Sequence, residues 1–143
     1  MTEFTSTIRT IPHNDARVFA MLSDLSNLQR VRNSIPEDSI KAFSLTDDHC
    51  SFEISPIGKI EFRIVDREPN KTIKFETTQS PVPLHLWIQL KQMAESDTRM
   101  KLTVRADLNP FLKPMVSKPM QDAVEKISEI LAGLPYEEQD LAQ

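Results

Sequence analysis

The chain has 143 residues, of which 39% are hydrophobic and 27% are charged, a balance that fits one globular domain with its own core and excludes a disordered chain. The formal net charge is −4, with acids and bases interleaved, so neither a nucleic-acid-binding surface nor stable membrane association is expected. A single cysteine favours a reducing, cytoplasmic location, and the first residues, MTEFTSTIRT, lack the features of a secretory signal.

A change in apolar spacing at Pro12 marks the first predicted elements. Residues 3–11 alternate between polar and apolar types, which predicts a strand that Pro12 ends. Its predicted inner face carries Phe4, Ser6 and Ile8. Beyond Pro12 the apolar residues follow helical spacing, with Asn14 or His13 as the expected N-cap. A second, short helix is expected over residues 27–33.

Residues 39–107 alternate with a period of two and are interrupted at regular intervals by turn-forming residues. This pattern is typical of an antiparallel meander. The six predicted strands run over residues 40–45, 50–55, 59–67, 72–78, 84–93 and 99–106. Apolar residues lie on one face of these strands and charged residues on the other, so we expect the apolar face to be covered and the charged face to meet solvent.

The C-terminal segment is the predicted element long enough to cover the apolar face. Its apolar residues recur at steps of three and four between Leu112 and Leu134, as along one side of a helix. Each proline inside a helix removes a backbone hydrogen bond and crowds the preceding turn. Pro114 and Pro119 are therefore expected to kink or break the first half, and the regular helix is predicted to begin near Pro119.

Cap residues predict the ends of this helix and of the domain. Asp107 or Asn109 is expected to cap its start, and Gly133 is expected to end it. A single domain is therefore predicted over residues 1–134. Residues 135–143 are predicted to form an acidic, flexible tail.

The order of one strand, two short helices, six meandering strands and one long helix resembles the START-like, or birch pollen allergen-like, superfamily of polyketide cyclase/dehydrase and lipid-transport (SRPBCC) proteins. The local sequence that carries the resemblance is Ile11-Pro12, then Ala16-Arg17-Val18-Phe19-Ala20-Met21-Leu22-Ser23-Asp24, then Asn27-Leu28. The resemblance covers the chain up to about Leu134. It implies an α+β helix-grip fold, in which a curved seven-stranded antiparallel sheet wraps around the C-terminal helix and leaves a cavity between them.

The turns of a meander alternate between the two ends of its sheet. The turns at residues 56–58 and 81–83 and the junction at 107–110 therefore share one end. Their prolines stiffen that end, and the helix beside it carries two more prolines. We expect the mouth of a cavity there, although prolines are also simply good turn formers.

The candidate ligand-binding residues are the side chains predicted to face the interior, together with Ser6 as a small polar residue on the same side. They are Ser6, Phe52, Ile54, Phe62, Phe75, Leu86, Ile88, Leu102, Val104, Leu112, Met115, Val116 and Met120. Each of them, taken singly, suits a dry core as well as a ligand contact. Ser6 is suited to a hydrogen bond with either a ligand or the backbone.

No catalytic residue, metal ligand or cofactor is predicted. His49 and Cys50 are neighbours on a strand and point to opposite faces, and no second pair lies at metal-ligand spacing. The two glycines of the chain leave no room for a phosphate-binding loop. His85 and Trp87 are expected on the outer face, with Trp87 packed among long side chains such as Arg105.

Three functions remain open from the sequence. The favoured one is binding or transport of a small, largely apolar molecule, either a lipid or an aromatic metabolite, in the cavity between sheet and helix. A polyketide cyclase-like enzyme would need an inward acid or base that the alternation does not supply. A protein-interaction module would have a filled core and use the outer sheet and Trp87. A monomer and a homodimer are equally compatible with the sequence.

Overall fold

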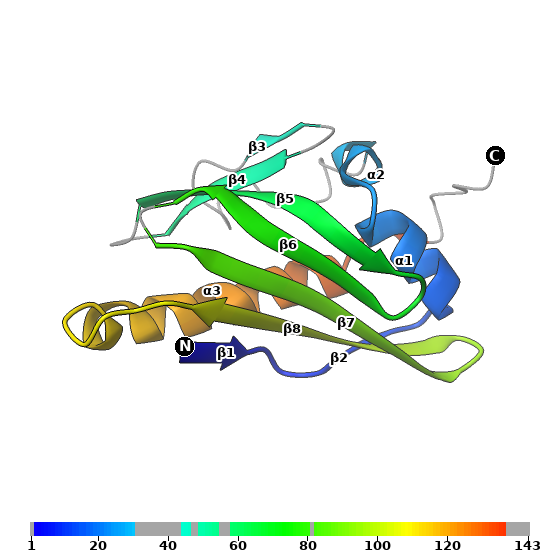
Figure 1. Cartoon of the computed structure of the whole chain (residues 1–143). Coiled ribbons are helices and arrows are strands. Elements are labelled where there is room, and N and C mark those ends of the chain that lie inside the picture. Colours follow the sequence, from blue (N-terminus) through cyan, green and yellow to red (C-terminus); the bar gives the residue numbers. More distant parts are fainter. Residues whose placement is uncertain (1, 31–43, 47–48, 55–57, 81, 137–143) are drawn as a thin grey trace.

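A computed structural model of the chain describes residues 2–30, 44–46, 49–54, 58–80 and 82–136, and their side chains apart from those of residues 28–30, 45, 54 and 79. Eight strands form one antiparallel sheet (Figure 1). Their bounds are β1 (Thr2–Thr5), β2 (Arg9–Ile11), β3 (Ser44–Leu45), β4 (His49–Ile54), β5 (Gly58–Glu68), β6 (Thr72–Gln79), β7 (Leu84–Ala94) and β8 (Asp97–Ala106). The order across the sheet is β1-β8-β7-β6-β5-β4-β3, and β2 also pairs with β8. Because β1 and β2 share one edge position, the predicted seven-stranded sheet is confirmed.

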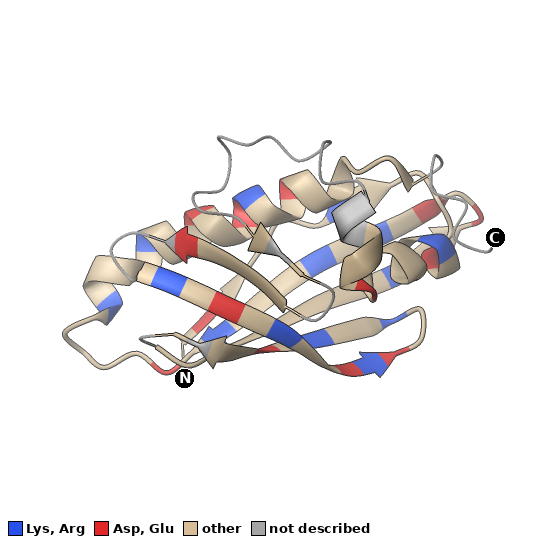
Figure 2. Cartoon of the chain, turned by 90° about the horizontal axis from the view of Figure 1, so that it is seen from above, with Lys and Arg blue, Asp and Glu red and all other residues tan. Residues whose placement is uncertain are grey.

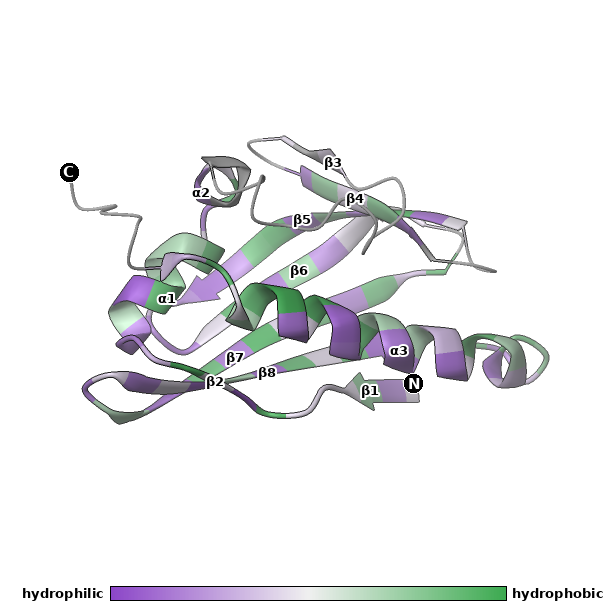
Figure 3. Cartoon of the chain, turned by 180° about the vertical axis from the view of Figure 1, so that it is seen from behind, coloured by the Kyte–Doolittle hydropathy of each residue, from purple (hydrophilic) through white to green (hydrophobic). Residues whose placement is uncertain are grey.

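Three helices complete the described fold, namely α1 (Asp15–Leu22), α2 (Leu25–Arg30) and α3 (Lys113–Ala132). The helix α3 lies along the inner face of the sheet, and Figure 3 shows the apolar bands of the strands behind it. Val116, Met120 and Val124 on α3 are buried at four-residue spacing, as predicted. None of the described helices is both long and apolar enough to cross a membrane.

The inner face of the sheet is apolar and its outer face is charged, as the alternation predicts. On β8, Met100, Leu102 and Val104 are buried, whereas Arg99 and Arg105, which flank this run, are exposed. Figure 2 shows lysine and arginine interspersed with acidic residues along the strands and along α3. The apolar core therefore lies between the sheet and α3, and α1 adds Val18, Met21 and Leu22 to it.

The sequence predicts one continuous strand over residues 3–11. In the structure this strand is interrupted between β1 and β2. Ser6 causes the break, because its backbone N–H donates to the Leu102 carbonyl oxygen (2.9 Å) while its hydroxyl oxygen accepts from the Leu102 N–H (3.0 Å). The hydroxyl thus replaces a backbone group in the ladder. Beyond this interruption of the strand, Ile8 is 60% exposed, so its predicted inward orientation is wrong.

The helix α3 begins at Lys113 and continues through Pro119, so the predicted start near Pro119 is wrong. Pro114 lies in the first turn, where its missing N–H costs nothing. Pro119 leaves the carbonyl of Met115 without its helical donor, but Met115 is exposed, so water can satisfy that oxygen. The predicted cap of this helix at Asp107 or Asn109 is wrong, because Leu112 is the N-cap and makes no side-chain cap hydrogen bond. The Asn109 Oδ1 instead accepts from the N–H groups of Phe111 and Leu112, in the turn before the helix.

The first two helices begin at side-chain caps. The Asn14 Oδ1 accepts from the Arg17 N–H at 2.8 Å, which confirms Asn14 as the N-cap of α1. The Asp24 carboxylate accepts from the N–H and hydroxyl of Ser26, so α2 begins at Leu25, two residues before the predicted start. Residues 31–33 of the predicted second helix and residues 40–43 of the next predicted strand lie outside the described residues.

The C-terminal end of the fold includes Pro135 and Tyr136, which the sequence places in a flexible tail. Tyr136 is 1% exposed and its hydroxyl donates to the Leu131 carbonyl oxygen at 2.5 Å. Its own carbonyl oxygen accepts from Arg17 Nη1 at 3.1 Å. The packed domain therefore extends at least to Tyr136, and the predicted tail over 137–143 lies outside the described residues.

A polar cluster fastens α3 to the broken edge strand. The Glu125 carboxylate accepts from the N–H of Thr7 at 2.5 Å and from its hydroxyl at 2.7 Å. Arg9 donates through Nε to the Ser128 hydroxyl oxygen (3.0 Å), lies 3.6 Å from the Glu125 carboxylate, and donates through Nη2 to the Glu125 carbonyl oxygen (3.2 Å). Because the strand is interrupted at Ser6, the N–H and hydroxyl of Thr7 are available to donate to Glu125 on α3.

Replacing Glu125 with glutamine is expected to destabilise the fold in a pH-dependent way. The hydrogen bonds from the Thr7 N–H and hydroxyl, with a smaller contribution from Arg9, lower the pKa of Glu125 below its ordinary value of 4.5. A lowered folded-state pKa adds stability above the ordinary value, and that stability is lost as the pH falls through the folded-state pKa. With the side chain 36% exposed, we expect a loss of about 1 kcal/mol near neutral pH.

Urea unfolding over a pH series measures this effect. The difference between the wild type and Glu125→Gln should be largest above the ordinary glutamate pKa and should shrink on acidification. Glu129→Gln, an exposed change on the same helix, is the matched control and should change little. A Glu125→Gln deficit that stays constant down to strongly acidic pH would contradict the assigned role of the carboxylate.

Candidate functional site

A small apolar cavity lies between the sheet and α3. Its volume is about 10 Å³, which is at the lower limit for one water molecule. The sheet contributes Phe52, Phe62, Leu84, Leu86 and Val104, and the helix contributes Met120, Ala123, Val124 and Ile127. The walls that the described residues form are thus apolar on both sides and close together.

The strand register places the sheet side of this cavity. Phe52 on β4 and Phe62 on β5 face inward on adjacent strands, with ring centroids 5.7 Å apart and planes at 29°. Leu86 on β7 is directly opposite Val104 on β8. Alternation along each strand then points all four side chains at α3. The cavity lies near the start of β7 and the end of β8.

The helix side of the cavity includes one small side chain, that of Ala123. Met120, Val124 and Ile127 follow the spacing of one helix face, and Ala123 lies among them with a single methyl group. A methyl at this position leaves the space that a larger side chain would fill. Met120 is unbranched and changes rotamer at low cost. These two residues make this wall the part most easily reshaped.

Most of the predicted site residues face the interior, but only some border the cavity. Phe52, Phe62, Leu86, Val104 and Met120 line it. Phe75, Ile88, Leu102 and Val116 are buried in the surrounding core, and Leu112 is half-buried against it. The strand faces of the buried residues are as predicted, whereas their distance from the cavity depends on their position along each strand.

Three predicted site residues have a different status. Ser6 is buried, but its hydroxyl donates to the Thr7 carbonyl oxygen and accepts from the Leu102 N–H, so it serves the backbone. Met115 is 60% exposed, and the prediction that it faces inward is wrong. It precedes Val116 on the first turn of α3, so the two side chains point about 100° apart around the helix axis. The side chain of Ile54 lies outside the described residues.

Four lining residues were not among the predicted site residues. They are Leu84, Ala123, Val124 and Ile127. The strand alternation through Leu86 and the helical spacing through Met120 both contain the signal for them. What the sequence does not contain is the position of α3 along the sheet, which determines which turns of the helix face the cavity.

Cys50 is a half-buried, unreactive thiol beside this region. It is directly opposite Phe62 across the β4–β5 pair. Burial, with a smaller contribution from the nearby Glu61 carboxylate, raises the pKa of the Cys50 thiol to about 12. The thiol is therefore protonated at neutral pH and a poor nucleophile. Among the described residues, His, Cys, Asp and Glu form no group of three that could hold a metal ion.

The predicted outward orientation of His85 and Trp87 is confirmed. Their rings stack with centroids 6.0 Å apart on the outer face. The Trp87 ring has the Lys74 Nζ 5.4 Å from its centroid and the Arg105 Cζ at 5.5 Å. Arg105 is the packing partner that the sequence predicts, and both cations lie within the range of a cation–π interaction.

The architecture matches solved structures over nearly the whole chain. A START superfamily protein from Mycobacterium smegmatis superposes with a TM-score of 0.67 at 12% identity, covering 92% of this chain and 94% of that chain. The chain has the START-like, helix-grip fold. At this level of identity the likeness shows the fold alone.

Two further solved structures share the START-like fold. Norcoclaurine synthase from Thalictrum flavum, solved in complex with dopamine and hydroxybenzaldehyde, gives a TM-score of 0.70 at 7% identity over 92% of this chain and 84% of its own. A protein from Rhizobium loti gives 0.60 at 20% identity, over 92% of this chain and 94% of its own. No protein-family model and no curated protein sequence matches the chain.

Proposed function

We propose that this START-like chain binds a small, largely apolar molecule, either a lipid or an aromatic metabolite, between the sheet and α3, and so sequesters or carries it. The observation that carries the proposal is the apolar cavity whose walls come from both layers of the fold. Binding would be driven by removal of the ligand from water, worth about 25 cal/mol per Å² of apolar surface, less the cost of immobilising the ligand.

The size of the cavity constrains how a ligand would bind. Pockets for small molecules typically measure about 300–1,000 Å³, whereas the described walls enclose about 10 Å³. The space between these described walls is therefore nearly closed, and a ligand that binds there must separate α3 from the sheet. We infer that Met120 moves first and that the ligand occupies the space beside Ala123. The expected entrance is the end with the turns at 56–58 and 81–83, of which residues 56–57 and 81 lie outside the described residues.

The composition of the walls favours binding over catalysis. None of the nine lining side chains carries a carboxylate, an imidazole, an amine or a hydroxyl group. Cyclisation of a polyketide would need a group that moves a proton at the reacting atoms. Norcoclaurine synthase has the same fold, but this likeness extends no residue role to the present chain. An apolar enclosure without proton-transfer groups supports ligand carriage.

Filling the cavity tests the proposal. We expect Ala123→Phe to occupy the space beside Met120 and to abolish ligand binding. Because the ring is larger than the cavity of about 10 Å³, it overpacks the interface at a cost of about 1–3 kcal/mol, which a domain of ordinary stability tolerates while remaining folded. Lys126→Phe adds the same side chain at an exposed position of α3 and is the matched control. Native mass spectrometry of gently purified protein and thermal shifts with fatty acids and aromatic compounds measure binding.

The proposal predicts a bound molecule, or a ligand-induced thermal shift, in the wild type and Lys126→Phe but not in Ala123→Phe. Equal binding by Ala123→Phe and the wild type would place the ligand elsewhere and overturn the proposal. Absence of any bound molecule or shift in the wild type would also overturn it and would favour the interaction module.

A further inference from the structure

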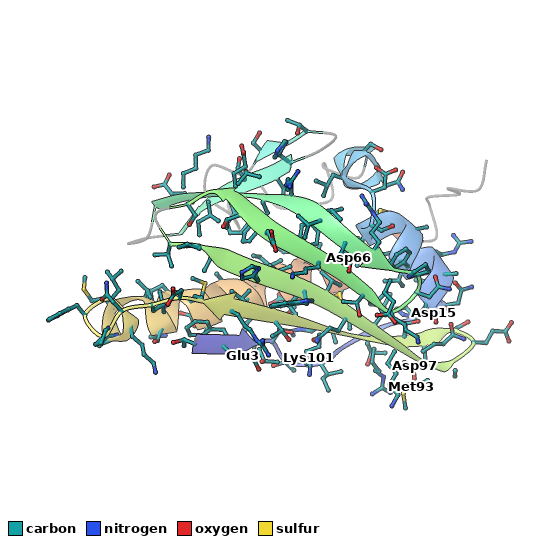
Figure 4. All side chains as sticks on the ribbon, in the orientation of Figure 1. Glu3, Asp15, Asp66, Met93, Asp97 and Lys101 are labelled. Atoms are coloured by element: carbon teal, nitrogen blue, oxygen red, sulfur yellow. The ribbon has the colours of Figure 1, made fainter. Side chains whose placement is uncertain are left out.

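A second depression lies on the opposite face of the sheet, outside the interior site. It measures about 380 Å³, within the range of small-molecule pockets. Its lining residues are Glu3, Trp87, Gln89, Lys101, Thr103 and Arg105. Figure 4 labels Glu3 on β1 and Lys101 on β8, along the edge of the sheet that these two strands form. We call this depression the outer hollow.

The register of three strands explains why the sheet is hollowed there. Thr103 on β8 lies between Trp87 on β7 and Thr5, the last residue of β1. Its short, buried side chain forms the floor. Lys101 and Arg105, two residues before and after on the same face, are long and form walls. β1 ends beside Thr103, so the break at Ser6 leaves this side of Lys101 without a neighbouring β1 residue.

The outer hollow presents mainly hydrogen-bond donors. The Thr103 hydroxyl donates to the Gln89 Oε1 at 2.8 Å, which leaves the amide nitrogen of Gln89 as a donor toward the hollow. Arg105 donates through Nε to the Glu3 carboxylate at 2.9 Å, and its other guanidinium N–H groups remain. The Lys101 side chain is half-buried, and no described residue forms a hydrogen bond or ion pair with its ammonium group.

The charges of the outer hollow do not cancel. Its lining carries Lys101 and Arg105 against Glu3 alone, although the chain as a whole has a net charge of −4. An ammonium group without a protein partner is free to pair with an anion, and charge-assisted hydrogen bonds are the stronger ones. Trp87 adds a flat aromatic wall beside these donors, and Lys74 approaches its ring from β6, away from the hollow.

From this arrangement we infer that the outer hollow binds a small aromatic molecule that bears one anionic group. The anionic group pairs with Lys101 and the Gln89 amide, and the ring packs beside Trp87. The shared chemistry is a flat ring with a carboxylate or a phosphate. This site is independent of the interior site, because Leu86 and Val104 line the interior from the other face of the same two strands.

Trp87 gives a direct readout, because it is the only tryptophan in the chain. Its single indole N–H resonance can be followed by NMR during titration with benzoate, phenyl phosphate and benzamide, the last a neutral analogue of benzoate. We expect a saturable shift with benzoate or phenyl phosphate and at least tenfold weaker binding of benzamide. Ala123→Phe should leave this shift intact, which separates failure of the outer hollow from failure of the interior site.

The variant Lys101→Gln removes the unpaired charge. It should reduce the affinity for both anions about tenfold, the equivalent of one charge-assisted hydrogen bond. Lys91→Gln makes the same charge change at an exposed position of β7 and should bind as the wild type does. Two results with the wild type would overturn the inference: an indole resonance that neither anion shifts, or benzamide binding as tight as that of benzoate. Two results with the variants would also overturn it: anion affinity unchanged in Lys101→Gln, or reduced equally in Lys101→Gln and Lys91→Gln. The first two comparisons use the wild type and do not depend on a variant's folding.

Discussion

Phe62→Ala is expected to lower the free energy of unfolding by about 3–5 kcal/mol, the cost of truncating a large aromatic side chain in a packed core. Phe62 is almost fully buried, and its ring stacks on Phe52 at 5.7 Å. It also borders the existing cavity. The space left by the ring would join that cavity and enlarge it. The cost then depends on how far the surrounding side chains can move in to fill the enlarged cavity.

Urea unfolding measures the loss in Phe62→Ala, and Phe111→Ala is its control. Phe111 is 87% exposed, so its truncation should change stability by no more than about 0.5 kcal/mol. The enlarged cavity should also bind a small apolar molecule such as benzene, which would raise the unfolding midpoint of Phe62→Ala but not of Phe111→Ala. A loss of less than about 1 kcal/mol in Phe62→Ala would contradict the tight packing between sheet and helix.

Tyr136→Ala should cost about 3 kcal/mol, although the residue lies only seven positions from the chain end. The Tyr136 ring is buried 5.8 Å from the His13 ring, centroid to centroid. The Tyr136 hydroxyl and carbonyl join it to Leu131 on α3 and to Arg17 on α1. Its loss would unfasten the C-terminal end of α3 from the first helix.

Tyr136→Phe separates the hydroxyl from the ring and should cost only about 1 kcal/mol. Burial raises the pKa of Tyr136 above its ordinary value of 10.0, so the folded chain keeps its phenol proton where the unfolded chain releases it. Stability from this difference is complete below the ordinary value and is lost as the pH rises above it. Unfolding of Tyr136→Phe in urea should lack that alkaline loss. Equal stability of Tyr136→Ala and the wild type would show that residues 135–136 do belong to a tail.

Residue spacing alone predicts the layers of the fold, because periodicity records which side of an element is buried. Alternation through Met100, Leu102 and Val104 identifies the inner face of β8, and the four-residue spacing of Val116, Met120 and Val124 identifies the buried side of α3. These signals are local and repeat many times. A single proline could therefore move the predicted start of α3 without changing its buried side.

The site depends on quantities that no spacing contains. The cavity volume is the small difference between the space enclosed by sheet and helix and the side chains that fill it, so it requires their separation and register. Ala123 becomes a wall residue only because α3 lies at one position along the sheet, and Ser6 breaks the edge strand only because Leu102 lies opposite.

The sequence by itself thus determined which residues turn inward, how the elements follow one another, and that the outer face is charged. Tertiary structure alone decided how closely α3 approaches the sheet, that Tyr136 is buried and that a hollow forms over Thr103. The physical reason is that the burial of each residue follows from its position in the local spacing of apolar residues. Empty space, by contrast, depends on how surfaces from distant parts of the chain pack together after folding.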